Sequence, residues 1–481
     1  MVEPVKQFAV GFDLDLTLVD PRPGVAASMA ALSRDTGVAI DVDAVVGRLG
    51  PPLEQELARW FPADRVAAAA ELYRDRYAEL GPTGTTALPG ARGALAAVRR
   101  HGGRVIVATA KRADLATACL AAVGLDVDVL AGGVWGAGKA AVLREHGATA
   151  YVGDHPLDVL AARTAGVAAI GVATGGTSGA ELRSAGADRV LADLSGFPDW
   201  LEHHLLPARL DRLEQRLSDL GSMLVAFSGG TDSAFLLAAA VRALGPDSVA
   251  AATAVSSSLA AGELERATAF AAGLGIRHET PRTDEMGRAG YRANAGDRCY
   301  FCKAELLDVL GPVAAGLGLQ AVGIGTNADD AVAGFRPGIR AAAERGAVTP
   351  LRDVGLTKAQ VRLASRAWNL PTWDKPAAAC LSSRVAYGVP ITPARLARVD
   401  RAEAALRASL AEAGLHVRNL RVRDLGAGRA RVEVDAPLAD ILLGRPALLD
   451  AVEGFDRVDV DPQGFRSGSM NELLADPELY R

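Results

Sequence analysis

A glycine-rich turn between a strand and a helix constrains this chain more than any other feature of the sequence. Residues Ser228–Ser233 read SGGTDS; they follow the apolar run Leu224–Phe227 and precede the helical pattern Ala234–Leu244. Backbone N–H groups at a helix start point outward, and the helix dipole favours an anion there. Two glycines let a phosphate approach the main chain, and the hydroxyls of Ser228 and Ser233 add donors. The turn predicts an α/β domain that binds phosphate, although no Gly-Lys-Ser/Thr of the Walker type follows.

The size and composition of the chain limit its class. A chain of 481 residues exceeds what one core usually serves, which predicts two or three domains. A net charge of −5 gives no electrostatic basis for holding a nucleic-acid backbone, so we expect no nucleic-acid partner. The sequence shows no signal segment and no apolar run of the roughly 18 residues that span a membrane, so we expect a cytoplasmic protein without a membrane partner. Only six residues are lysine, so a lysine inside a motif is informative.

The alternation of apolar strands and helical stretches predicts three domains. Residues 1–206 alternate in this way and include a helical insert over about 21–85. After a polar helix over 201–220, residues 207–385 alternate again, and residues 386–481 hold one long helix and two strand-like runs. The predicted fold class is α/β, with two parallel-sheet, three-layer domains and a small α+β subdomain at the C-terminal end.

An acidic motif, DLDLT, ends the first predicted strand. Because side chains alternate along a strand, Asp13 and Asp15 would share a direction if the strand continued, at the edge where ligand sites form in open α/β sheets. Two carboxylates favour a divalent cation, and one can act as a nucleophile. Later in this block, polar residues follow strands or a glycine-rich turn, at Thr109, Lys139, Asp154 and Asp158.

This order of residues resembles the haloacid dehalogenase (HAD) superfamily of hydrolases, particularly its phosphoglycolate-phosphatase-like branch with a helical cap, over residues 8 to about 200. The resemblance implies a HAD Rossmann-like fold in which Asp13 attacks phosphorus and Asp15 acts as acid and base. It also implies phosphate contacts from Thr109 and Lys139. The Mg²⁺ ligands implied by the family are Asp13, Asp15, Asp154 and Asp158. A fold retained only for docking or regulation is the alternative. Three basic residues either shape the pocket on the cap side or lie on a solvated surface: Arg48, Lys111 and Arg112.

Three of the four cysteines accompany the polar motifs of the second block. Cys299 and Cys302 form a C-x-x-C pair, and Cys380 lies well apart in sequence, whereas Cys119 belongs to an apolar helix and is expected in a core. The remaining motifs are TDE at 283–285, DRCYFCK at 297–303, GTNADD at 325–330, DKPAAACLSSR at 374–384 and GFRSGSMNE at 464–472. From about residue 210 to 472 the chain resembles the LarE-type ATP-dependent sulfur transferases of the nickel-pincer cofactor pathway, within the PP-loop ATP pyrophosphatases.

The resemblance implies that ATP, with Mg²⁺, adenylates a carboxylate of pyridinium-3,5-biscarboxylic acid mononucleotide, and that sulfur then displaces AMP to leave a thiocarboxylate. The pyrophosphate contacts it implies are Ser228, Gly229, Gly230, Asp232 and Ser233, with Asp329 or Asp330 as further candidates near the metal. It places Cys380 at the catalytic step. The implied partners are this nucleotide-like carboxylate, a sulfur donor and further copies of the chain in a homo-oligomer.

The source of sulfur is left open by the sequence. Cys299, Cys302 and Cys380 could hold a 4Fe-4S cluster with one iron open to sulfide. Alternatively, by the resemblance to another type of the family, Cys380 gives up its own sulfur, or the thiols bind zinc with His278 or form a disulfide. Polar groups expected near an anionic substrate are Glu285, Arg298, Arg336, Arg384, Arg466, Ser467 and Ser469. The competing function is an amide-forming synthetase or a tRNA thiolase with a non-catalytic HAD scaffold.

Overall fold

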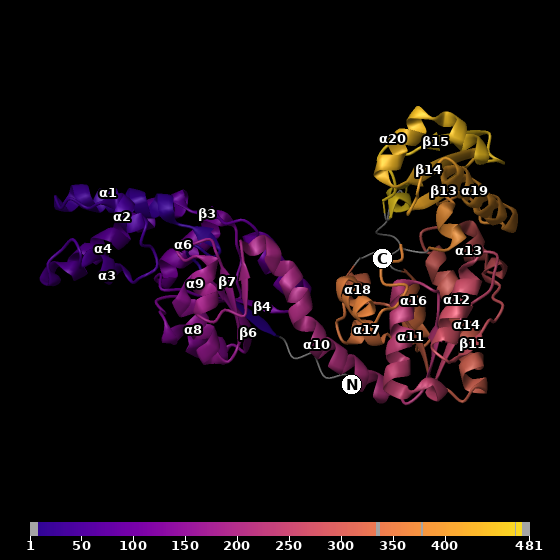
Figure 1. Ribbon diagram of the computed structural model, residues 1–481, viewed down its shortest axis with the longest axis horizontal. Coiled ribbons are helices and arrows are strands. Elements are labelled where there is room, and N and C mark those ends of the chain that lie inside the picture. Colours follow the sequence, from indigo (N-terminus) through magenta and orange to yellow (C-terminus); the bar gives the residue numbers. More distant parts are fainter. Residues whose placement is uncertain (1–7, 333–336, 377–378, 467, 474–481) are drawn as a thin grey trace. The chain divides into compact units, whose positions relative to one another are not determined.

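The computed structural model describes residues 8–332, 337–376, 379–466 and 468–473. The chain forms two compact units, Met1–His204 and Leu205–Arg481, which are described separately below (Figure 1). Arg336 and Ser467, which were expected near an anionic substrate, lie outside the described residues. No helix in the described ranges is both long enough and apolar enough to cross a bilayer.

A six-stranded parallel sheet forms the centre of the first unit, in the order β5-β4-β1-β6-β7-β8. Its strands are β1 (Ala9–Phe12), β4 (Arg104–Ala108), β5 (Val129–Ala131), β6 (Ala148–Gly153), β7 (Ala168–Val172) and β8 (Arg189–Leu191). The helices between and after them are α5 (Ala91–Arg100), α6 (Ala113–Val123), α7 (Ala137–Glu145), α8 (Pro156–Ala165), α9 (Gly179–Ser184) and the first part of α10 (Phe197–Ser218), which ends in the second unit. Strands buried on both faces are apolar throughout, as β1 is, and this confirms the predicted parallel α/β fold of this unit.

The helical insert predicted over about 21–85 is confirmed as four helices, whose core also includes Leu115 and Cys119 of α6. They are α1 (Arg22–Thr36), α2 (Val42–Val46), α3 (Leu53–Leu57) and α4 (Ala63–Leu80). Met29, Leu57 and Tyr73 are buried in this core. An antiparallel ribbon of β2 (Val19–Asp20) and β3 (Thr86–Ala87) pairs the chain where it leaves for the insert with the chain where it returns. We call α1–α4 the cap.

The second unit contains a four-stranded parallel sheet in the order β11-β10-β9-β12. Its strands are β9 (Met223–Ala226), β10 (Val249–Ala252), β11 (Arg277–Glu279) and β12 (Ala321–Ile324). Its helices are α11 (Thr231–Leu244), α12 (Glu263–Gly273), α13 (Ala289–Ala293), α14 (Arg298–Gly316), α15 (Ala328–Val332), α16 (Pro337–Glu344), α17 (Pro350–Asp353) and α18 (Lys358–Ala367). The strand and helix predicted around the SGGTDS turn are β9 and α11.

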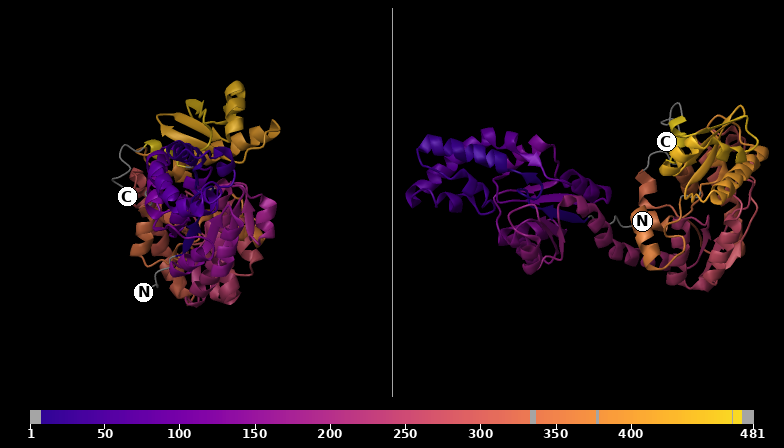
Figure 2. Two further views of the ribbon diagram at one scale, coloured as in Figure 1. Left: turned by 90° about the vertical axis from the view of Figure 1, so that its left-hand side faces the viewer. Right: turned by 45° about the horizontal axis from the view of Figure 1, so that its top comes forward.

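A separate three-stranded sheet, β13-β14-β15, completes the second unit (Figure 1, Figure 2). It consists of β13 (Leu420–Gly426), β14 (Arg429–Val434) and β15 (Arg457–Val460), with α19 (Pro393–Glu412) and α20 (Ala436–Gly444) packed against it. Apolar side chains of β13, β14 and both helices share one core. The two predicted strand-like runs are β13 and β14. The third strand, β15, was not predicted, because four residues that alternate between charged and apolar give too short a signal.

Candidate functional site

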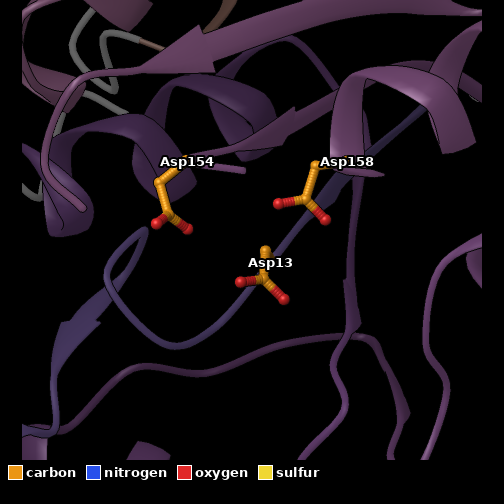
Figure 3. A group of neighbouring side chains, drawn as sticks. All are labelled: Asp13, Asp154 and Asp158. Atoms are coloured by element: carbon orange, nitrogen blue, oxygen red, sulfur yellow. The ribbon is translucent and has the colours of Figure 1, made fainter. Parts of the chain in front are cut away.

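Three carboxylates converge at the carboxyl ends of β1 and β6. Oxygen atoms of Asp13, Asp154 and Asp158 lie within 4.8 Å of one another, and all three residues are buried (Figure 3). Because β1 and β6 are hydrogen-bonded neighbours, Asp13 and Asp154 follow adjacent strands, and Asp158 lies in the first turn of α8. Carboxylate oxygens are the ligands that Mg²⁺ prefers in proteins. This cluster, which we call the aspartate triad, therefore fits a divalent cation.

Mutual repulsion within the triad strengthens the case for a cation. Burial raises the pKa of Asp13 to about 7, against the opposing effect of Lys139 and with a further contribution from Asp158. Burial, together with Asp13 and Asp158, raises the pKa of Asp154 to about 8. Neighbouring buried carboxyl groups raise one another's pKa values, because two negative charges close together are unfavourable. A bound cation would lower these pKa values again.

Lys139, in the first turn of α7, bridges two members of the triad. Its Nζ donates to Asp13 Oδ1 at 2.7 Å and to Asp158 Oδ1 at 2.7 Å, and the side chain is almost wholly buried. The other oxygen of Asp158 accepts the N–H of His155 at 3.2 Å, which closes the capping box of α8. The helices α7 and α8 therefore hold Lys139 and Asp158 in fixed positions. A group that stabilises charge in a transition state must be held in place in this way before the reaction begins.

Thr109 and Asp15 flank the triad in different ways. Thr109 is buried at the end of β4, the other neighbour of β1, and its Oγ1 accepts the N–H of Lys111 at 3.2 Å. The carboxylate of Asp15 is outside the triad and accepts from Lys111 Nζ at 2.8 Å. The reason is that β1 ends at Phe12 and Leu16 has φ 59°, so the strand alternation that would align Asp15 with Asp13 does not continue.

Two residues that hold Asp154 were not identified from the sequence. Thr17 Oγ1 donates to Asp154 Oδ1 at 3.2 Å. A β-carbon at position 175 would lie 1.8 Å from Asp154 Oδ2, so the approach of this carboxylate requires Gly175. Thr17 belongs to the DLDLT motif and could have been proposed on that ground. Gly175 has an adjacent glycine, Gly176, and no local pattern separates the two.

A cavity of about 310 Å³ lies between the triad and the cap. The triad, Thr109 and Lys139 line its floor, and residues of α1–α4 line part of the opposite side. Arg48, Lys111 and Arg112 also line it, and the side chains of Arg48 and Arg112 are partly exposed to solvent as well. We call this space the cap cavity.

The SGGTDS turn in the second unit is closed by its own serines. Ser233 Oγ accepts the N–H of Ser228 at 3.3 Å, and the two hydroxyl oxygens are 3.1 Å apart. Gly229 has φ 69°, a conformation that a β-carbon disfavours. The N–H of Gly230 points to Ser228 Oγ at 3.4 Å. The turn is therefore a preformed loop at the start of α11, as an anion site requires.

Charged residues surround this turn. Asp232 pairs with Lys358, while its Oδ1 is buried and makes no hydrogen bond with the described residues. Lys375 Nζ donates to Gly229 O at 3.0 Å and to Glu263 Oε2 at 2.7 Å. A buried carboxylate oxygen without a donor fits a metal ion that accompanies a phosphate. Lys358 and Glu263 were not among the predicted site residues.

One cavity of about 690 Å³ joins the turn to two cysteines. Ser228, Gly230, Asp232 and Ser233 line one part of it, and Cys302 and Cys380 line another. Glu285 and Asp330 also line it, together with Arg384, Arg407 and Arg421. We call it the loop–cysteine cavity. Residues of the turn and the two cysteines are far apart in the sequence, and they line the same cavity in the structure.

The three cysteines of this unit differ in their surroundings. Cys299 and Cys302 are one turn apart on α14, and Cys299 and Cys380 are exposed. Burial, with neighbouring Cys380 and Glu285, raises the pKa of the Cys302 thiol. In the described part of the chain, no three cysteine or histidine ligand atoms lie within 4.8 Å of one another. His278 instead contacts Thr253 Oγ1 at 2.8 Å, so the alternative of a zinc ion with His278 as ligand gains no support.

Several residues expected to meet an anionic substrate also have hydrogen-bond partners within the chain. Arg298 Nη1 donates to Ser382 O at 2.9 Å, and Arg384 Nη1 donates to Cys380 O at 3.0 Å. Because an unpaired main-chain carbonyl is costly to bury, these buried guanidinium groups fix the backbone on both sides of Leu381. Their geometry indicates that they position Cys380.

The same holds for the C-terminal GFRSGSMNE motif. Arg466 Nη2 lies 3.1 Å from Glu472 Oε2. Ser469 Oγ donates to Glu433 Oε1 at 3.0 Å and is buried. A hydroxyl that already donates to a carboxylate is a poor phosphate donor. Glu285, by contrast, lines the loop–cysteine cavity and accepts from Ser258 Oγ at 2.7 Å.

Comparisons with known proteins divide the chain in the same way. A family model described as haloacid dehalogenase-like hydrolase matches residues 10–163, and one described as HAD-hydrolase-like matches residues 137–197. A phosphoglycolate phosphatase of Rhodospirillum rubrum is 34% identical over 40% of this chain and 90% of that protein. A solved hydrolase of Pseudomonas syringae, 25% identical, covers 41% of this chain and 98% of its own, with a TM-score of 0.36.

Two further relatives each cover more than half of the chain. A pyridinium-3,5-bisthiocarboxylic acid mononucleotide synthase of Lactiplantibacillus plantarum is 33% identical over 55% of this chain and 94% of that protein. An uncharacterized protein of Synechocystis sp. is 42% identical over 56% of this chain and 99% of that protein. Through its first unit the chain therefore belongs to the haloacid dehalogenase-like hydrolases, and through its C-terminal half it is a relative of the Lactiplantibacillus plantarum synthase.

Proposed function

We propose that the chain carries two active centres. The first is a Mg²⁺-dependent phosphomonoester hydrolase, and the observation that carries it is the aspartate triad with Lys139 on the floor of the cap cavity. The second is an ATP-dependent sulfur transferase that converts a carboxylate of pyridinium-3,5-biscarboxylic acid mononucleotide to a thiocarboxylate. The observation that carries it is the loop–cysteine cavity, which joins a phosphate loop to two thiols.

In the first centre, Asp13 is the proposed nucleophile. Its free oxygen attacks phosphorus, the P–O ester bond breaks, and an aspartyl-phosphate forms while Asp15 gives a proton to the leaving alcohol. Asp15 then takes a proton from the water that hydrolyses the acyl phosphate. Thr109 and Lys139 hold the phosphoryl oxygens and balance their charge. Mg²⁺ held by Asp13, Asp154 and Asp158 would supply further positive charge at the phosphate.

The variant Asp13→Asn tests this mechanism. It removes the nucleophile with little change of shape, so Mg²⁺-dependent release of phosphate from phosphomonoesters should fall by a factor of about 10³ or more. Asp35→Asn is the matched control, since Asp35 pairs with Arg76 on the cap away from the cavity, and it should keep wild-type turnover. Full activity of Asp13→Asn would rule out the aspartyl-phosphate.

In the second centre, the substrate carboxylate attacks the α-phosphorus of ATP. An acyl-adenylate forms and pyrophosphate leaves into the turn, where Ser228, Ser233 and main-chain N–H groups meet its oxygens. A sulfur nucleophile then attacks the acyl carbon and AMP leaves. Arg298 and Arg384 hold the backbone around Cys380 at the other part of the cavity. A 4Fe-4S cluster held by Cys299, Cys302 and Cys380 would supply an open iron position for sulfide.

Pyrophosphate release tests the second centre. Asp232→Asn and Ser233→Ala should abolish substrate-dependent pyrophosphate release from ATP, because both residues line the cavity at the turn. Asp247→Asn changes an exposed carboxylate outside the cavity and should leave release unchanged. Release at the wild-type rate in both loop variants would contradict the assignment.

The competing proposal keeps the adenylation step and changes the acceptor. An amide-forming synthetase or a tRNA thiolase would use the same turn, with the first unit as a non-catalytic scaffold. Two thiols that line the adenylation cavity favour sulfur over ammonia. Mass spectrometry of the product distinguishes the proposed transferase from the amide-forming synthetase, since a thiocarboxylate and an amide differ in mass and only the first requires sulfide.

A further inference from the structure

The cations that line the cap cavity already have carboxylate partners. Among the described residues, the lining cations are Arg48, Arg74, Lys111, Arg112 and Lys139. Lys139 bridges Asp13 and Asp158, and Lys111 Nζ lies 2.8 Å from Asp15 Oδ1. Both lysines are therefore committed to the floor of the cavity, next to the phosphate position.

The arginines at the cap side are paired in the same way. Arg48 forms a two-point contact with Glu56, with Nη2–Oε1 at 2.6 Å and Nε–Oε2 at 3.2 Å. Arg112 forms one with Asp114, with both N–O distances at 2.7 Å. The partners of Arg74 are Glu54 and Glu71. A substrate carboxylate would have to displace a protein carboxylate from one of these arginines, and such an exchange yields little net free energy.

Apart from His155 and the carboxylates of these ion pairs, the remaining wall of the cap cavity is mostly apolar. Its apolar and aromatic side chains are Val25, Met29, Val45, Leu49, Leu53, Tyr73, Tyr77, Leu115 and Trp135. An apolar cavity of about 150 Å³ holds benzene, so one of about 310 Å³ accommodates a phosphoryl group with a single ring or a short aliphatic chain.

We infer that the first unit acts on phosphomonoesters whose alcohol part is uncharged and apolar, and that it discriminates against esters with a second anionic group. This inference rests on the proposed phosphatase activity and narrows its substrate class. The phosphate meets Lys139, Thr109 and the metal, while the alcohol part replaces water against the apolar wall. A carboxylate in the same place would lose its hydration without gaining an unpaired cation.

A matched pair of substrates tests this class. Benzyl phosphate and 2-phosphoglycolate are both esters of a primary alcohol, and they differ in carrying a phenyl ring or a carboxylate. With Mg²⁺ and the full chain, kcat/KM for benzyl phosphate should exceed that for 2-phosphoglycolate by about tenfold or more. Equal or higher kcat/KM for 2-phosphoglycolate would overturn the inference and leave the phosphatase proposal standing. Turnover of neither ester would contradict both.

Removal of the carboxylate that pairs with Arg48 should reduce the preference for benzyl phosphate over 2-phosphoglycolate. In Glu56→Gln the guanidinium of Arg48 loses its charged partner, while the amide oxygen can still accept from Trp60 Nε1. The kcat/KM for 2-phosphoglycolate relative to benzyl phosphate should rise by about tenfold, the scale of one charge-assisted hydrogen bond. Asp35→Asn removes an equal charge from the cap outside the cavity and should leave the ratio unchanged. An unchanged ratio in Glu56→Gln would contradict the role given to the ion pairs.

Discussion

At the scale of single residues, the three cysteine thiols of the second unit are the groups on which the proposed sulfur transfer depends. Cys302 and Cys380 line the cavity that contains the SGGTDS turn, and Cys299 lies one helical turn before Cys302 on α14. A buried thiol beside a carboxylate and a second thiol resists ionisation, as the raised pKa of Cys302 indicates. A bound cluster would remove that cost, since coordination to iron deprotonates a thiol.

Iron content tests the cysteine set. Anaerobic reconstitution should load about four irons per chain, and Cys299→Ala, Cys302→Ala or Cys380→Ala should each lower that number. Cys119→Ala provides a matched control, because the fourth cysteine is buried in the first unit beside Tyr77. Mass spectrometry after turnover should show Cys380 intact. Loss of one sulfur at Cys380, with no iron bound, would instead support the sacrificial alternative.

Some positions of single residues could be predicted from the sequence, and others could not. DLDLT correctly suggested acidic residues at a strand end, and the structure brings Asp13, Asp154 and Asp158 together there. The predicted position of Asp15 depended on one assumption, that the strand continued, but β1 ends at Phe12. The partners of Arg298 and Arg384 are main-chain carbonyls, which no side-chain motif reveals.

At the scale of elements, a buried carboxylate joins β13 to α19. Asp424 Oδ2 accepts from Arg395 at 2.8 Å and from Arg398 at 2.6 Å, and its Oδ1 accepts the N–H of Gly426. Burial alone would raise the pKa of Asp424, but the N–H of Gly426 and the two guanidinium groups hold it below its usual value. This contact therefore stabilises the C-terminal sheet only while Asp424 is ionised.

Asp424→Asn should lower the free energy of unfolding of this sheet by about 2 kcal/mol at pH 7. A carboxyl whose pKa is depressed by folding contributes stability above the unfolded pKa of about 3.9, and loses it as the pH falls through the folded pKa. The difference between variant and wild type should thus shrink below about pH 4. Hydrogen exchange of peptides from β13 and β14 during urea titration measures it, with exposed Asp450→Asn as control. A difference that persists unchanged at low pH would contradict the argument.

Long helices and strands could be predicted from the sequence more readily than strands of two to four residues. Apolar runs predicted parallel sheets, and helical periodicity over about 21–85 predicted the cap, since both patterns extend over many residues. β15 has four residues and partial exposure, so its pattern is too brief to register. Boundaries between cap and sheet depend on the β2–β3 ribbon, whose strands have two residues each.

At the scale of the whole molecule, each candidate centre is built within one unit. Residues of the first unit alone line the cap cavity, and residues of the second alone line the loop–cysteine cavity. Lysine is rare in this sequence, and a lysine in a motif therefore indicated a candidate site residue in each unit. The described lysines that line one of these cavities are Lys111, Lys139, Lys303 and Lys375, and Lys358 pairs with Asp232. In a chain whose basic residues are mostly arginine, these lysines all lie in or beside the two candidate cavities.

Two centres in separate units should fail independently, and one crossed assay tests this most directly. Wild type, Asp13→Asn and Ser233→Ala are each assayed for Mg²⁺-dependent phosphate release from benzyl phosphate and for substrate-dependent pyrophosphate release from ATP. Asp13→Asn should lose only phosphate release, and Ser233→Ala should lose only pyrophosphate release. Retention of both activities in both variants, or loss of both activities in either folded variant, would contradict the account of two separate centres.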